Sequence, residues 1–208
     1  MEYEPPLVQG FKARYGKDPH QLDEHDSDWL AYRATTLTQF MREVRAVLNE
    51  AGRGRRLELS VIVASTETEN LYYGMDLREW VRLELVDTII PYTSAPKLLS
   101  RADSWVDPSA ARFFFDLTRG TRCKLAFNLM PRDLSPAEYR RRAHRLYQSG
   151  AEYLFLWDGG ERTRFNAPRL GHREEIARWV AAGEPPLTLP SVRVRKLGRW
   201  DFRLDTPG

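Results

Sequence analysis

Residues 124–130, Lys-Leu-Ala-Phe-Asn-Leu-Met, form a short apolar run bounded by turn residues. A run of this length and composition is typical of a β-strand. Three other segments have the same character: Leu57–Val63, Val86–Tyr92 and Glu152–Asp158. We therefore predict four strands, spaced along most of the chain.

Stretches with helical spacing precede and separate these strands. Apolar residues recur every three or four positions over residues 28–49, 76–83, 136–149 and 172–182, which predicts four helices. Asp76 and Ser135 are candidate N-caps, and Gly52, Gly150 and Gly183 stand where a left-handed residue closes a helix. Alternating helices and strands predict parallel pairing, in either an open doubly wound sheet or a (β/α) barrel.

Two details favour the α/β class with a TIM-type (β/α) barrel. No glycine-rich phosphate loop follows any strand, and polar or aromatic residues gather beyond every predicted strand end. The gathered residues are Thr66–Asn70, Tyr92–Ser94, Asn128 with Pro131–Asp133, and Trp157–Gly160. In a barrel these ends form one rim, where the chemistry takes place. Four strands are half of the eight in a closed barrel.

Side-chain alternation assigns the two faces of the predicted strands. In residues 124–130, Leu125, Phe127 and Leu129 should face the surrounding helices, which leaves Ala126, Asn128 and Met130 toward the barrel axis. The same parity places Ser60 and Ile62 inside. Asn128 then points into the site, with a hydrogen-bonded core amide as the alternative.

The composition excludes several classes of protein. The net charge is only +3, and the one dense basic run, Tyr139–Arg145, has the spacing of a solvated helix face, so we expect no nucleic-acid partner. No apolar run approaches the roughly 18 residues of a membrane span, and the first residues lack a secretory signal, which leaves export of a longer parent open. The single Cys123 excludes an internal disulfide.

Motif searches remove further enzyme classes. The chain contains no serine nucleophile elbow, P-loop or dinucleotide fingerprint. His20 and His25 are the one close pair of histidines, and they lack the spacing of a metal site. We therefore expect neither a metal nor an organic cofactor.

The order and spacing of several segments carry a family resemblance. These segments are Tyr3–Val8, Tyr15–Gly16, Asp28–Arg33, Thr38–Val44, Gly74–Asp76, Leu85–Pro91, Tyr139–Ala143 and Gly150–Asp158. Over residues 3–183 the chain resembles the second half of the hypothetical glycosyl hydrolase-like TIM-barrel proteins, the family-10-like glycosylhydrolases. The resemblance implies the last four β/α units of a barrel within residues 1–186. Residues 187–208 are then a linker and the start of a further β segment.

Glycoside cleavage requires two carboxyl groups roughly 5–9.5 Å apart. Glu67, Asp158 and Glu4 are the catalytic candidates, because each lies at or beyond an expected strand end. Two-glutamate barrel hydrolases carry their nucleophile on the seventh strand, where this chain instead has Asn128. Candidates for sugar binding are Glu69, Tyr92, Asn128, Arg132 and Trp157.

The leading interpretation is a glycoside hydrolase that acts on a polysaccharide or oligosaccharide. The alternative is a non-catalytic barrel module that binds glycan or supports other domains. Each catalytic candidate also has a structural interpretation, because Glu67 and Glu69 can belong to a solvated loop and Asp158 to a turn. An incomplete barrel leaves open sheet edges, so self-association is also expected, and half of the active-site rim is absent.

Overall fold

The computed structural model describes residues 3–92, 108–129, 135–156 and 170–186, and two short strands near the C-terminus. Four strands form one parallel sheet in the order β1-β2-β3-β4. They are β1 (Ser60–Val63), β2 (Thr88–Pro91), β3 (Lys124–Asn128) and β4 (Tyr153–Phe155). The predicted strands, their parallel pairing and their sequential order are confirmed, although each strand is shorter than predicted.

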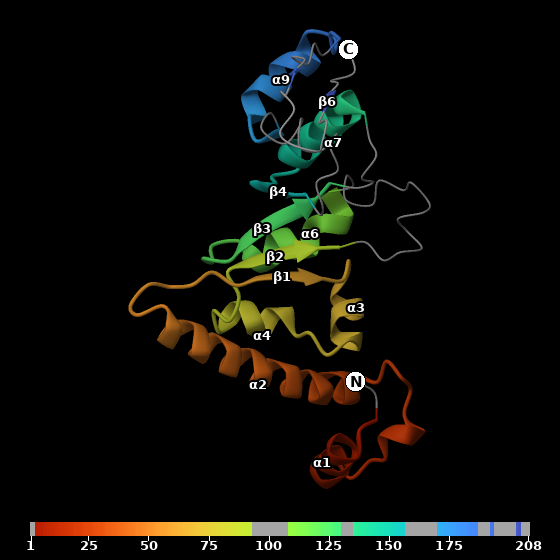
Figure 1. The fold of residues 1–208 in the computed structure, drawn as a ribbon. Coiled ribbons are helices and arrows are strands. Elements are labelled where there is room, and N and C mark those ends of the chain that lie inside the picture. The colour runs from red at the N-terminus through yellow and green to blue at the C-terminus, as the bar shows by residue number, and fades with distance from the viewer. Residues whose placement is uncertain are drawn as a thin grey trace.

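The described helices are shown with this sheet in Figure 1. They are α1 (Pro5–Tyr15), a 3-10 turn at Pro19–Gln21, α2 (Ser27–Ala51), α3 (Glu67–Tyr72), α4 (Leu77–Arg82), α6 (Pro108–Thr118), α7 (Pro136–Gln148) and α9 (Arg173–Ala181). The four predicted helices are α2, α4, α7 and α9. Helices α1, α3 and α6 were not predicted.

The predicted helix ends are confirmed in all but one case. Asp76 accepts a hydrogen bond from the Glu79 N–H, and Ser135 forms a reciprocal capping box with its own helix. Gly150 and Gly183 have positive φ values, as expected after a helix. The prediction for Gly52 is wrong, because its φ is −69° and the left-handed residues are the next two along the chain.

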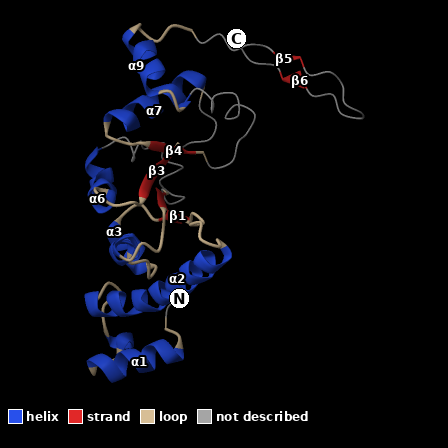
Figure 2. Ribbon diagram, turned by 90° about the vertical axis from the view of Figure 1, so that its left-hand side faces the viewer, coloured by secondary structure: helices blue, strands red, loops and turns tan. Residues whose placement is uncertain are grey.

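The helices pack against one face of the sheet. Val63, Ile89, Leu125 and Phe127 share a buried cluster with apolar residues of α2, α4, α6, α7 and α9. Figure 2 shows α3 and α6 on the same side of the strands. A doubly wound sheet has helices on both faces and a point where its strand order reverses. Sequential order with helices on one face is instead compatible with part of a (β/α) barrel.

The other face of the sheet contains the described residues that alternation assigned to the barrel axis, whereas Met130 lies outside the described residues. Ala126 and Asn128 are buried on this face, whereas Leu125, Phe127 and Leu129 belong to the helix-covered cluster, as predicted. Ile62 on the edge strand β1 is 40% exposed, and Tyr153 on the other edge strand, β4, is 45% exposed. Apolar surface is therefore exposed at both edges of this face.

Two further features lie outside the sheet. Val8, Phe11 and Trp29 form a second apolar cluster that joins α1 to α2. Near the C-terminus, β5 (Val192–Arg193) pairs antiparallel with β6 (Arg203–Leu204), which agrees with the predicted β segment after residue 187. Across the described residues, no helix combines the length and apolar character needed to cross a membrane.

Candidate functional site

The carboxyl edge of the sheet holds one row of residues on the face away from the helices. Asn128 pairs with Phe155, and continuing the register of β1, β2 and β3 by one residue places Ala64 and Tyr92 in the same row. The Tyr92 N–H donates a 2.8 Å hydrogen bond to the Val63 carbonyl, which fixes the end of β2 beside β1. Tyr92, Asn128 and Phe155 thus lie on neighbouring strands at one edge.

Asn128 is the unusual member of this row. Its side chain is 1% exposed, and no described residue forms a hydrogen bond with its amide nitrogen or its amide oxygen. A buried polar group left without a partner costs roughly 1–3 kcal/mol. Among the described residues, the structure therefore shows no partner for the alternative interpretation, a hydrogen-bonded core amide.

Asn70 is a second buried asparagine, and its amide is fully used. Its Nδ2 donates to the carbonyl oxygens of Ala64 (3.0 Å) and Thr66 (2.7 Å), and its Oδ1 accepts from the Ala64 N–H at 2.9 Å. These bonds close the turn between β1 and α3. The Asn70 amide is therefore structural, whereas the Asn128 amide is available to bind another partner.

Glu69 is engaged in the same turn. Its Oε2 accepts hydrogen bonds from the Ser65 hydroxyl at 2.9 Å and the Ser65 N–H at 3.2 Å, while the Thr66 hydroxyl accepts from the Glu69 N–H. Glu67 and Glu69, for which a solvated loop was the structural alternative, therefore belong to a capped helix, α3. Glu69 stabilises the helix start, as carboxylates in a first turn commonly do.

Glu67, the first catalytic candidate, forms an ion pair. Its two carboxylate oxygens accept hydrogen bonds from Arg78 Nε at 2.5 Å and Arg78 Nη2 at 3.0 Å. The Arg78 guanidinium also lies 5.2 Å from the centre of the Phe113 ring. A general acid must donate a proton, whereas this carboxylate accepts two hydrogen bonds from a cation.

Another catalytic candidate, Glu4, is not brought to the carboxyl edge of the sheet. Glu4 is the N-cap residue of α1, and α1 lies on the far side of α2 from the sheet (Figures 1 and 2). Asp158, Trp157 and Arg132 lie outside the described residues. Among residues that are described, no three His, Cys, Asp or Glu side chains gather as they would around a metal ion.

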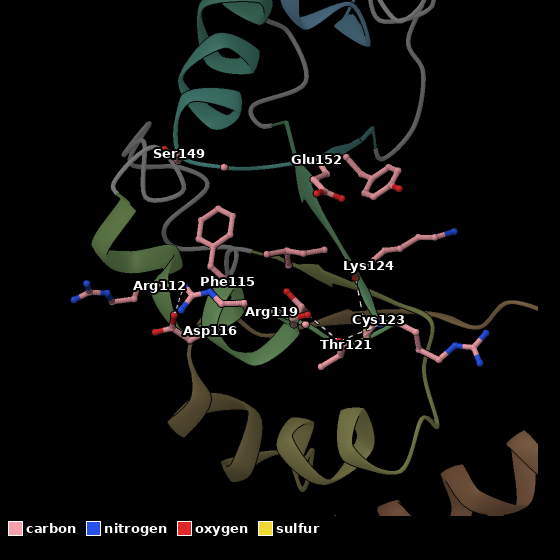
Figure 3. A pocket seen from close by; sticks show the side chains of 15 residues that line it. Arg112, Phe115, Asp116, Arg119, Thr121, Cys123, Lys124, Ser149 and Glu152 are labelled. Carbon is pink, nitrogen blue, oxygen red and sulfur yellow. Dashed lines mark hydrogen bonds and ion pairs between the residues drawn. The ribbon is translucent and has the colours of Figure 1, made fainter.

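A large pocket lies at the opposite, amino-terminal end of β3 and β4. It has a volume of about 1040 Å³, and Phe115, Ser149, Glu152 and Lys124 lie around it (Figure 3). Most of its charged residues are paired: Lys124 with Glu58 at 2.7 Å and Arg119 with Asp116 at 2.7 Å. In barrels this end of the sheet supports stability, and the chemistry occurs at the carboxyl end.

Sequence reasoning missed the roles of Asn70 and Arg78. The structural role of Asn70 could have been predicted from the sequence, because asparagine side chains commonly form hydrogen bonds with nearby backbone groups at turns. Nothing in the sequence indicated the role of Arg78, because its hydrogen bond to Glu67 joins residues that are 11 positions apart. The pairing depends on how α3 and α4 are placed.

Comparison with known proteins does not assign this chain to a family. No protein-family model matches this chain, and no curated protein matches it. The resemblance to the family-10-like glycosylhydrolases stays a prediction.

Proposed function

We propose that this chain supplies four consecutive β/α units of a carbohydrate-active (β/α) barrel that hydrolyses a glycan. The observation that supports this proposal most strongly is Asn128 at the carboxyl edge of the sheet, a buried amide whose two polar atoms have no hydrogen-bond partner among the described residues. Sugar hydroxyls donate and accept hydrogen bonds, so they match both atoms of this amide. Tyr92 and Phe155, in the same row, offer the aromatic surface that covers the apolar side of a sugar ring.

The topology supports the barrel part of this proposal. Neighbouring strands are consecutive in sequence, and the helices cover one face. In such an arrangement, the residues that follow the carboxyl ends of the strands meet at one rim. Fold alone does not decide activity, so the glycan assignment depends on the residues at this rim.

A second candidate, a glycan-binding module without catalysis, is favoured by the described carboxylates. Glu67 is paired with Arg78, and Glu69 caps the start of α3. Under the hydrolase proposal, Asp158 supplies one carboxyl group, and Glu67 becomes the acid when substrate displaces Arg78. Under the binding-module alternative, no carboxyl pair within hydrolytic distance is needed.

A hydrolysis assay with neutral oligosaccharides and their aryl glycosides tests the hydrolase proposal. We expect the chain to release new reducing ends, and Asp158→Asn and Glu67→Gln to lower turnover by roughly 10²–10⁴-fold. An aryl leaving group needs little protonation, so it should partly rescue Glu67→Gln but leave Asp158→Asn impaired. Asp116→Asn, at the opposite end of the sheet, is the matched control. Binding without cleavage would favour the second candidate, and absence of both would contradict the proposal.

A further inference from the structure

Asn128 is buried, and its described neighbours on this face of the sheet are uncharged. Two rows of described residues cover the face away from the helices near the carboxyl edge: Ala64, Tyr92, Asn128 and Phe155, and below them Ile62, Ile90, Ala126 and Tyr153. Neither row contains an acidic or basic side chain. The nearest cation on this face of β3 is Lys124, at the other end of the strand, and Glu58 already pairs with it at 2.7 Å.

This environment discriminates between classes of sugar. A carboxylate, sulfate or phosphate buried beside Asn128 would meet no cation in either of these two rows of described residues. Burying a charge without a partner costs far more than burying a hydrogen-bonded hydroxyl. The amide offers two N–H donors and one carbonyl acceptor, which suit two neighbouring hydroxyl groups.

We infer that Asn128 is a specificity-determining residue whose amide binds two adjacent hydroxyls of an uncharged sugar unit, so that the site excludes acidic sugars. The inference rests on the proposed glycan function and adds the class of sugar to it. Because Asn128 is only 1% exposed, the ligand must displace the side chains that cover it. Association should therefore be slower than for a preformed open site.

The same inference predicts a trade-off between binding and stability. Leucine has nearly the shape of asparagine but no polar atoms, so Asn128→Leu removes a buried group that lacks partners. This variant should melt at a higher temperature than the wild type and bind glycan roughly 10- to 100-fold more weakly. Asn70→Leu is the matched control: it also replaces a buried asparagine, but it removes three hydrogen bonds and should melt at a lower temperature.

Isothermal titration calorimetry of the full chain tests this inference. The probes are neutral gluco-, xylo- and manno-oligosaccharides and oligomers of glucuronic and galacturonic acid. We expect at least one neutral oligomer to bind and its acidic counterpart to bind at least about 10-fold more weakly. Asn128→Leu should reduce the neutral binding.

Three outcomes would overturn the inference, and each can be distinguished. Equal affinity for neutral and acidic oligomers removes the selectivity but leaves the glycan function intact. Undiminished binding by an Asn128→Leu variant that melts cooperatively removes Asn128 from the site. Failure of every oligosaccharide to bind the wild type contradicts the proposed function itself.

Discussion

Arg45 donates a 2.6 Å hydrogen bond to the Asp87 carboxylate, and both side chains are buried. The same carboxylate accepts from Arg56 Nε at 2.5 Å and from the Leu59 N–H at 2.8 Å. Arg45 also donates to the Leu85 and Leu57 carbonyls, so it links α2 to the segments before β2 and β1. This buried ion pair fixes the long helix against the amino end of the sheet.

The first prediction is that Asp87→Asn destabilises the fold. The amide cannot compensate the charges of Arg45 and Arg56, and breaking a buried pair costs about 3–5 kcal/mol. Urea denaturation followed by circular dichroism measures this loss in the free energy of unfolding. Asp116→Asn breaks an exposed ion pair with Arg119 and should change stability little. Equal losses in the two variants would contradict the structural role of Asp87.

The second prediction concerns pH. Burial by itself raises the pKa of Asp87, but hydrogen bonds from Leu59, Arg56 and Arg45 outweigh it and hold the pKa below its ordinary value of 3.8. A lowered pKa contributes stability that is fully present above the unfolded value and is lost as pH falls through the folded value. The stability difference between wild type and Asp87→Asn should therefore be constant above about pH 5 and shrink below pH 4. A difference that grows on acidification would reverse the predicted sign.

The third prediction is that Cys123 is unreactive in the folded protein. Burial is the largest cause that raises the pKa of its thiol, to about 11, and the nearby charge of Asp87 adds to it. Because the thiolate is the reactive form, iodoacetamide at pH 8 should modify Cys123 slowly. Mass spectrometry after timed quenching follows the reaction, and the chain unfolded in urea is the control. Equal rates in the folded and unfolded states would be incompatible with a buried thiol.

The fourth prediction concerns the open edges of the sheet. The Leu59 and Val63 carbonyls bond to the β2 segment, so alternation turns the backbone groups of Ser60 and Ile62 toward the free edge of β1. Exposed edges and apolar surface favour association. We expect the chain to self-associate, and Ile62→Lys to reduce this by placing a charge at the edge.

Sedimentation velocity over a range of concentrations measures this association, with Ile62→Val as the matched control and circular dichroism to confirm folding. Ile62→Val retains the apolar edge and should sediment like the wild type. A wild type that stays monomeric at every concentration would show that the edges are protected.

The sequence predicted the sheet well because its strands are short apolar runs with clear boundaries. Parity along residues 124–130 placed Phe127 against the helices and Asn128 on the other face. Helix α3 was missed because Glu67–Tyr72 lacks a strong apolar period. It begins where the Thr66 hydroxyl accepts the Glu69 N–H, and capping interactions of this kind are hard to recognise beside a polar run.

The candidate site was only partly predictable from the sequence, because some of its contacts depend on tertiary packing. Position at a strand end correctly selected Asn128 and Tyr92 for the carboxyl edge. The engagement of Glu67 by Arg78 depends on packing between α3 and α4, which local spacing does not encode. Glu4 was assigned by its place in the family order, whereas its helix packs on the outer side of α2.

The nuclear magnetic resonance signal of the Asn128 side-chain amide, followed during titration with the neutral oligosaccharides, tests the role of Asn128 in glycan binding most directly. We expect both N–H resonances of Asn128 to shift progressively and saturate with the glycan, while those of the fully bonded Asn70 amide stay in place. Asn128→Leu supplies the assignment, because it removes that pair of signals. Saturable glycan binding that leaves the Asn128 resonances unmoved would show that Asn128 does not contact the glycan.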